Sequence, residues 1–242
     1  MRHPRFQPPE EKKEYNLLYI DHLNQNFSGW MLLNYNKPVQ VSSTLGGFQP
    51  NYAVNEDIKT YWSAKSGAKG EYIISDLGEK STINAIQINY ADQDVELMGK
   101  PETTTGHKYV LYYSDNNKDW KILLDKSKNT KDVPHEYIEL QSPIRTRFLK
   151  LENIQMPTGK FALSGFRVFG NGSGEKPQAV KNFVPLRSGP KVEGERRNVW
   201  FKWQQEPSAD GYVIYFGKSP DKLYGSIMVY GKTEYYFNGL DR

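Results

Sequence analysis

The fold class is decided by a short alternating stretch, INAIQINY, at residues 83–90. Successive side chains of an extended strand point to opposite faces, so Ile86, Ile88 and Tyr90 share one face. Alternation of this kind is typical of a half-buried β-strand. The stretch therefore predicts a strand with one face in an apolar core.

The same period of two recurs on either side of this stretch. It is found in KYVLYYS (108–114), YIEL (137–140), RFLKL (147–151) and FRVFG (166–170). Turn residues bound the segments at 76–78, 115–117 and 170–172, so we expect the strand that ends in YIISDLG to stop at Gly78. Because no helical pattern intervenes, the chain is predicted to be all-β, an antiparallel sandwich or barrel.

A domain boundary is predicted at GNGSGEKPQ, residues 170–178, which is rich in Gly, Ser and Pro. A second β pattern follows, with alternating apolar residues in NVWFKW (198–203) and GYVIYFG (211–217). The first 28 residues are polar and rich in proline. We therefore expect a linker or the tail of an upstream domain at 1–28, one sandwich at 29–172 and a second at 173–242.

Composition excludes several classes of function. The net charge of +4 arises from 32 basic and 28 acidic residues spread along the chain, which argues against nucleic-acid binding. No apolar run has membrane-spanning length, so no membrane insertion is expected. The absence of cysteine excludes disulfides and thiolate metal sites, and the four scattered histidines lack zinc-site spacing. The first residues lack an apolar stretch and a small-residue cleavage site, so we expect no signal peptide within them and a targeting signal, if any, upstream.

Several stretches in a specific order resemble the discoidin family, also called the coagulation-factor C-type domain. They are NKPVQVSSTL (36–45), NYAVNEDIKTYWSA (51–64), GEYIISDLG (70–78), INAIQINY (83–90), YVLYYSDNNKDWKIL (109–123) and RFLKLENI (147–154). The carbohydrate-binding members of that family form carbohydrate-binding module family 32. The resemblance implies a discoidin-like jelly-roll β-sandwich over residues 29–172.

A finer resemblance links the chain to bacterial enzymes similar to glycoside hydrolase family 43, the β-xylosidases and α-arabinofuranosidases. It rests on HPRF (3–6), GWMLLNYNKPVQVSSTLGGF (29–48) and MPTGKFALSGFRVFGNG (156–172). It implies that this chain is the non-catalytic C-terminal accessory part of such an enzyme, secreted, periplasmic or at the cell surface. The implied partners are a plant-type polysaccharide of the xylan or arabinan class and the upstream catalytic domain.

The C-terminal stretches GYVIYFGKSPDKLY (211–224) and YYFNGL (235–240) resemble a fibronectin type III domain. A sandwich of that type has seven strands, and the resemblance implies that the last two are missing from this chain. We therefore expect a truncated domain with an unpaired strand edge and an exposed apolar face that bears Trp200 or Trp203, Tyr212 and Ile214.

The resemblance also implies where sugar would bind, on loops at one end of the sandwich. Carried over by position, the carbohydrate-binding residues are Lys65, Asp92, Gln93, Asp94, Asn129 and Phe161. Trp62 precedes these loops and is expected in the core, because a Trp in an apolar strand usually packs inside. The alternative is an ordinary set of solvated loops on a module that serves only as a spacer.

A structural Ca²⁺ is implied at the loop that precedes Trp62. Asn55, Asp57 and Thr60 would supply side-chain oxygens and Ala53 a carbonyl oxygen. Two departures from the family pattern weaken this expectation: Asn55 stands where an Asp is common, and Gly165 stands where a late Glu often binds the metal. The alternative is a capped Asx turn that holds the loop over the core.

We expect no catalytic residues in this chain. The predicted function is binding of polysaccharide, or scaffolding of the catalytic domain. Two alternatives remain at this point: a purely structural spacer, and a small free-standing glycosidase, for which a pair of carboxylates across a sugar cleft would be required.

Overall fold

The computed structural model describes residues 30–95, 106–172, 178–186, 198–209 and 211–237. The chain divides into two compact units, of which one comprises Trp30–Gly174 and the other holds the strands from Val184 onward. The prediction for residues 1–28 lies outside the described residues. Each unit is described below by itself.

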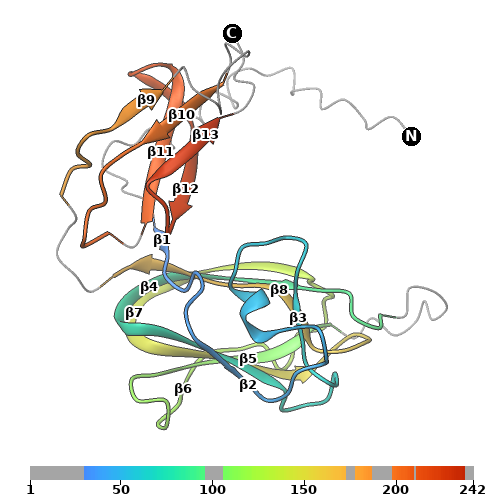
Figure 1. Ribbon diagram of the computed structural model, residues 1–242. Coiled ribbons are helices and arrows are strands. Elements are labelled where there is room, and N and C mark those ends of the chain that lie inside the picture. Colours follow the sequence, from blue (N-terminus) through green and yellow to red (C-terminus); the bar gives the residue numbers. More distant parts are fainter. Residues whose placement is uncertain (1–29, 96–105, 173–177, 187–197, 210, 238–242) are drawn as a thin grey trace, which may run out of the picture. The chain divides into compact units, whose positions relative to one another are not determined.

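The first unit is built from antiparallel strands (Figure 1). They are β1 (Met31–Leu32), β2 (Val39–Val41), β3 (Trp62–Ser63), β4 (Tyr72–Tyr90), β5 (Lys108–Ser114), β6 (Lys121–Asp125), β7 (His135–Gln155) and β8 (Ala162–Asn171). A single 3-10 turn, η1 (Pro50–Ala53), is the only helical element among the described residues. No helix in this part of the chain is long and apolar enough to cross a membrane.

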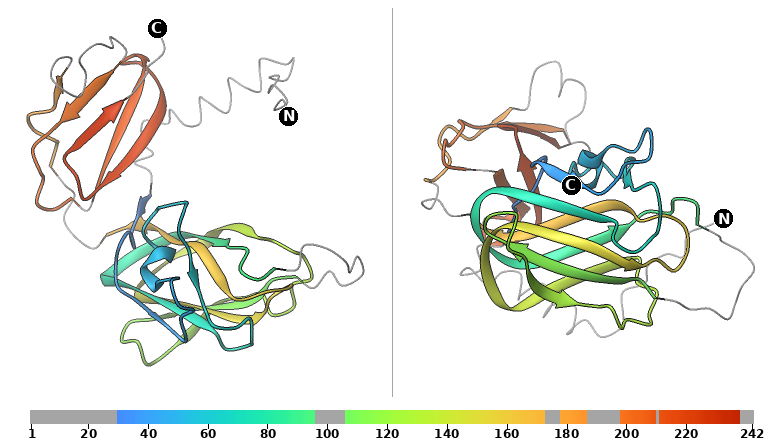
Figure 2. Two further views of the ribbon diagram at one scale, coloured as in Figure 1. Left: turned by 45° about the vertical axis from the view of Figure 1, so that its right-hand side comes forward. Right: turned by 90° about the horizontal axis from the view of Figure 1, so that it is seen from below.

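Two long strands, β4 and β7, belong to both layers of the sandwich. The first part of β4 pairs with β2 and with 148–152 of β7, whereas its second part pairs with β8 and with 135–146 of β7. Strands β5 and β6 extend the first layer, and β1 and β3 pair with β8 in the second. Figure 2 shows the strands of this unit in two further views, one of them from below. The predicted all-β sandwich is confirmed.

The core lies between the two layers and contains the residues that the alternation predicted. Ile86, Ile88 and Tyr90 are buried on one face of β4, and Leu149 and Leu151 face them from β7. Burying an aliphatic or aromatic side chain of this size contributes about 1.5–3 kcal/mol. The alternating stretches thus build one contiguous core.

Gly170 allows β8 to approach β4 closely. A Cβ atom at this position would lie 1.9 Å from the Thr82 backbone oxygen, a distance that no side chain can adopt. The strand pair therefore requires glycine here because of space, and its backbone needs no left-handed conformation.

One expected turn does not end a strand. Residues 76–78 lie within β4, which continues to Tyr90 with a shift of register between Asp76 and Ser81. The turn chemistry is nevertheless present, because Gly78 has a φ of +83° and its N–H donates to Asp76 Oδ1 at 2.8 Å. The polypeptide bends here from one layer to the other without leaving the sheet.

The second unit also consists of antiparallel strands. Its sheets are β13–β10–β9 and the hairpin β11–β12, with bounds β9 (Val184–Leu186), β10 (Val199–Lys202), β11 (Gly211–Ser219), β12 (Lys222–Tyr230) and β13 (Glu234–Phe237). Its core is formed by Trp203, Ile214, Val229 and Phe237. The expectation of an exposed face at Tyr212 and Ile214 is wrong: Ile214 is buried and Tyr212 packs against the same cluster.

The side chain of Asn34 joins the segment after β1 to strand β8, and its contribution can be tested. It is buried, its Nδ2 donates to the Phe166 carbonyl oxygen at 2.7 Å, and its Oδ1 accepts from the Val168 N–H at 3.0 Å. We expect Asn34→Ala to lower the free energy of opening of β8 by about 2–4 kcal/mol, because two buried backbone groups lose their partners. Native-state hydrogen exchange of the β8 amides measures this. The exposed Asn171, changed to Ala, is the control, and equal protection in the two variants would contradict the expectation.

Candidate functional site

Three loops meet at one end of the first unit. The segment after β3 is joined to the segment before β8, because the Ala64 N–H donates to the Phe161 oxygen at 2.9 Å and the Phe161 N–H to the Ser66 oxygen at 3.0 Å. The segment after β4 joins them, since the Lys160 N–H donates to the Gln93 oxygen at 2.9 Å. The loops that carry Lys65, Gln93 and Phe161 are therefore neighbours.

A chain of polar side chains runs across these loops. The Tyr61 hydroxyl donates to Gln93 Oε1 at 2.8 Å, and Gln93 Nε2 donates to Asp94 Oδ1 at 2.8 Å. The other Asp94 oxygen pairs with the Lys160 ammonium. The hydrogen bond from Lys160 is the main cause that holds the pKa of the Asp94 carboxyl below its usual range. The result is a strip of hydroxyl, amide, carboxylate and ammonium groups, here called the loop-end strip: Tyr61, Gln93, Asp94 and Lys160.

An aromatic pair flanks the loop-end strip. The rings of Phe48 and Tyr61 lie 4.8 Å apart and are tilted by 34°, and both residues are partly exposed. Trp62 next to Tyr61 is completely buried, with its Nε1–H donating to the Ser43 oxygen at 3.3 Å. Tyr61 directly precedes β3 and is partly exposed, whereas both residues of β3 are buried. Trp62 is thus a core residue, as predicted.

Phe161 does not belong to this surface. Its side chain is completely buried and meets the Trp62 ring edge to face, with 5.5 Å between the ring centroids. The expectation that Phe161 offers a ring to a sugar is therefore wrong: its backbone ties the loops together while its ring fills the core.

Asn129 is placed at the same end, but its amide is used within its own loop. Its Nδ2 donates to the His107 oxygen at 2.9 Å and to the Lys131 oxygen at 2.8 Å, and its Oδ1 accepts from the Lys131 N–H. His107 is buried and stacks on Tyr90 with the ring centroids 4.0 Å apart. Burial lowers the pKa of His107, and the Asp132 carboxylate opposes this effect. Asn129 therefore organises a turn.

Asp92 is exposed, and no contact joins its side chain to the loop-end strip among the described residues. It lies close enough to His107 for its charge to favour the protonated ring. Asp92 thus stands apart from the loop-end strip, whereas Gln93 contacts Tyr61 and Asp94 contacts Lys160.

Lys65 is exposed beside a cluster of serines around Glu71. Its backbone N–H donates to Ser43 Oγ at 2.9 Å, and Ser43 Oγ in turn lies 2.8 Å from Glu71 Oε2. Partial burial acts to raise the pKa of the Glu71 carboxyl, but hydrogen bonds from Ser42, Ser66 and Ser43 outweigh it and hold the pKa below the ordinary value of 4.5. Glu71 therefore anchors the loop that carries Lys65.

This anchor predicts a pH dependence. A carboxyl whose folded-state pKa is depressed stabilises the fold above its unfolded-state pKa and loses that contribution as the pH falls through the folded-state value. We therefore expect protection of the amides at 64–70 to fall below about pH 4.5, the ordinary Glu value, and Glu71→Gln to remove this pH dependence. Hydrogen exchange measured at several pH values tests it. An unchanged acid profile in the variant would assign the effect to other carboxyls.

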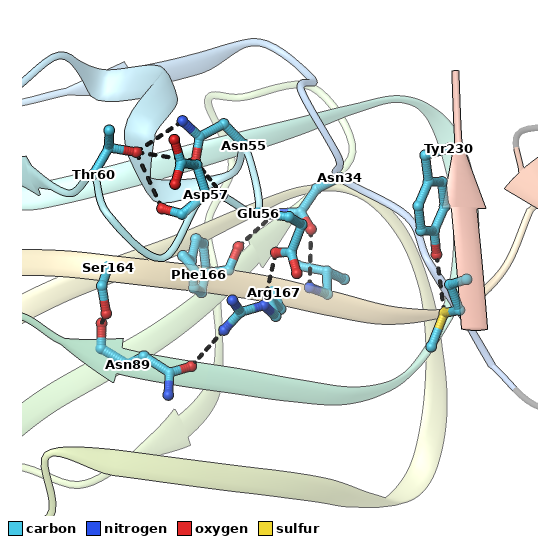
Figure 3. A network of polar contacts seen from close by, with 12 residues as sticks. Asn34, Asn55, Glu56, Asp57, Thr60, Asn89, Ser164, Phe166, Arg167 and Tyr230 are labelled. Carbon is cyan, nitrogen blue, oxygen red and sulfur yellow. Dashed lines mark hydrogen bonds and ion pairs between the residues drawn. The ribbon is translucent and has the colours of Figure 1, made fainter. Parts of the chain in front are cut away.

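A calcium ion in the loop that precedes Trp62 would require about six to eight oxygen ligands at about 2.3–2.6 Å. Asn55 Oδ1 accepts from the Asp57 N–H at 3.0 Å, and Asp57 Oδ1 accepts from the Lys59 N–H at 3.0 Å. Asn55 Nδ2, a donor, points at Thr60 Oγ1 at 3.0 Å (Figure 3). These side-chain oxygens are engaged with the loop itself, in the pattern of linked Asx turns.

The surroundings of the loop fit the ion no better. Ala53, the expected source of a carbonyl ligand, ends the 3-10 turn η1, two residues before Asn55. Within the described residues no group of three or more His, Asp or Glu side chains is arranged to hold a metal. The residues present therefore do not fit calcium, and they match the alternative of a capped turn.

Sequence reasoning missed three residues of this surface: Phe48, Tyr61 and Lys160. No sequence signal singled them out: the burial of Trp62 does not place Tyr61 outside, since Ser63 and Ala64 on its other side are buried as well. Phe48 and Lys160 each lie in a loop whose course depends on distant hydrogen bonds.

The profile of the F5/8 type C domain family matches residues 38–165, more than half of the chain. The chain therefore belongs to this family, as its sequence resemblance implied. None of the curated proteins compared with the chain matches it.

Solved structures of similar fold include sugar-binding modules from two bacteria. Chitosan-binding module 1 of a chitosanase/glucanase from Paenibacillus sp. IK-5, as its V110M mutant, is 20% identical, with a TM-score of 0.48 over 58% of this chain and 99% of the module. The family 32 carbohydrate-binding module of Clostridium perfringens NanJ, in complex with galactose, is 18% identical, with a TM-score of 0.46 over 58% and 98%.

Proposed function

We propose that the Trp30–Gly174 unit is a non-catalytic carbohydrate-binding module whose site is the loop-end strip with Phe48. The observation that carries the proposal is the position of two partly exposed rings beside a connected row of polar groups. Sugars present C–H faces that pack on aromatic rings and hydroxyls that pair with amide, carboxylate and ammonium groups. The strip offers both kinds of partner within one set of loops.

The binding constant is expected in the millimolar to high-micromolar range, about −4 to −6 kcal/mol. The strip is exposed, and a shallow surface provides little buried area to offset the loss of freedom on binding. Gln93 and Asp94 are already held by Tyr61 and Lys160, which reduces the cost of ordering them. Pre-organisation therefore contributes more to affinity here than contact area does.

We further propose that the polysaccharide is of the xylan or arabinan class, and that the chain serves a secreted bacterial enzyme similar to glycoside hydrolase family 43. The support for this is the resemblance of residues 29–48 and 156–172 to the accessory region of such enzymes. The fibronectin type III assignment of the second unit rests on the same kind of resemblance. Polysaccharide and the upstream catalytic domain are the proposed partners.

A glycosidase is the weaker alternative for physical reasons. A general acid for glycoside hydrolysis needs a carboxyl whose pKa is raised. The pKa of Asp94 is instead lowered by Lys160, so this group stays ionised at neutral pH. Its place in the strip suits hydrogen bonding to hydroxyls.

A second aromatic cluster lies on the outer face of the sheet but offers less to a sugar. The Lys150 ammonium lies 4.4 Å from the centre of the Tyr112 ring, 5.3 Å from that of Trp120 and 5.9 Å from that of Tyr72. The rings are thus engaged in cation–π contacts with a side chain of the protein itself.

Affinity electrophoresis of the full chain tests the proposed site. Gels containing xylan or arabinan are expected to retard the wild-type chain, and Tyr61→Ala and Lys160→Ala are expected to abolish the retardation because each removes one kind of sugar contact. Tyr137→Ala, which removes an exposed ring from β7, is the matched control. Soluble galactose and chitotriose serve as competitors that define the sugar class.

Two outcomes would contradict this assignment. Retardation that survives both loop variants would move the site elsewhere on the module. Absence of retardation of the wild-type chain by every glycan in the series would favour the spacer alternative.

Hydrolysis assays with aryl-xyloside and aryl-arabinoside test the proposal that the chain is non-catalytic. We expect no turnover above the blank by the full chain. Turnover that persists through repurification and is lost in Asp94→Asn would establish the chain as a glycosidase.

A further inference from the structure

We propose that the Arg167 guanidinium is a built-in cation that fastens residues 54–60, here called the Asx loop, to the sheet, so that the loop folds independently of calcium. The resemblance places a metal at this loop, and the residues present do not fit one. The loop instead binds the positively charged guanidinium of Arg167 through Glu56. The inference concerns the fold of the loop and stands whether or not the module binds sugar.

Arg167 is held between the Asx loop and strand β4. Its Nε–H donates to Glu56 Oε1 at 2.7 Å, and Nη1 donates to Asn89 Oδ1 at 2.7 Å (Figure 3). The Arg167 side chain is only 16% exposed and that of Glu56 34%. Charge-assisted hydrogen bonds shielded from water are among the stronger polar contacts, whereas removal of one partner leaves the other charge uncompensated.

Gly165 provides the space for this guanidinium. A Cβ at position 165 would lie 2.4 Å from Arg167 Nη1 and 2.9 Å from Cζ. The backbone of Gly165 is not left-handed, so its conformation does not call for glycine; a Cβ here would instead require the Arg167 guanidinium to move from its present place. Gly165 is also the position at which the resemblance expects a metal-binding Glu. A carboxylate there and the guanidinium of Arg167 in its present place exclude each other.

The backbone of Glu56 supports the same conclusion. Its φ of +59° lies in the left-handed region, which non-glycine residues adopt at a cost. Glycine would relieve that cost, but it has no side chain to reach Arg167. Glu56 therefore accepts an unfavourable backbone conformation and supplies the carboxylate that the cation binds.

The Asx loop leads directly into the buried part of the chain. The Val54 oxygen accepts from the Asn36 N–H at 2.9 Å, and the Thr60 N–H donates to the Asp57 oxygen at 3.1 Å. The first bond lies where the chain enters the loop, and the second lies within the loop. The amides of Asn36 and Thr60 are therefore local reporters of whether the loop is fastened.

The first test uses the wild-type chain. Its calorimetric melt and the exchange rates of the Asn36 and Thr60 amides are measured with millimolar CaCl₂ and with the chelator EGTA. We expect identical curves and identical rates, because ligand binding to the native state alone would raise the melting temperature. A melting temperature that rises with calcium, together with slower exchange of these two amides, would overturn the proposal.

The second test removes the cation. We expect Arg167→Gln to increase exchange of the two reporter amides about ten- to a hundredfold, since Glu56 is left without its partner. The β5 amides, which lie in the other layer, should keep their rates. Arg145→Gln makes the same chemical change at an exposed position and should alter nothing. Equal exchange in Arg167→Gln and the wild type would overturn the proposal.

Reversal of the pair separates a charge effect from a packing effect. Glu56→Arg alone and Arg167→Glu alone each place like charges together and are expected to speed exchange of the reporters. The double variant restores opposite charges and should recover part of the protection that each single variant loses. If the losses of the two single variants simply add in the double variant, the guanidinium and the carboxylate do not act on one another.

Discussion

The antiparallel pairing of β4 with β7 is the interaction on which the rest of the first unit depends. These two strands are paired from Tyr72 and Glu152 at one end to Asn89 and His135 at the other, and both pass from one layer to the other. Register shifts after Asp76 and after Ile83 allow the bend. Every other strand of the unit attaches to this pair directly or through one neighbour. Gln93 and Asp94 of the loop-end strip follow shortly after the end of β4.

The sequence was sufficient to predict the strands and the core, because a period of two combined with apolar residues leaves few alternatives. INAIQINY and RFLKL placed their inward residues correctly. The bend at 76–78 was recognised as a turn but not as a bend inside one strand, since pairing across it is a property of β7. Similarly, Ile214 is covered by Trp203, Val229 and Phe237, which come from separate segments of the chain and cannot be assigned from local pattern.

The candidate site was predictable at the level of loops and not of side chains. Gln93 and Asp94 lie on the loop-end strip. Phe161 is part of the core, and the side chain of Asn129 is hydrogen-bonded within its own turn. Whether a loop residue points inward depends on hydrogen bonds between segments far apart in the chain. Gly165 is a further example. In the sequence it was notable only because a metal-binding Glu often stands at this position, and the structure adds that it lies against the guanidinium of Arg167.

The proposed sugar site and the fastened Asx loop are connected through Tyr61, which follows the loop and carries the first group of the strip. The central claim is that sugar binds at this strip. Chemical-shift mapping of the ¹⁵N-labelled chain with soluble xylo- and arabino-oligosaccharides tests it most directly. The account predicts dose-dependent shifts confined to the amides around Phe48, Tyr61, Gln93 and Lys160. Shifts confined to the outer sheet face around Tyr112 and Trp120, or no shifts with any oligosaccharide, would contradict it.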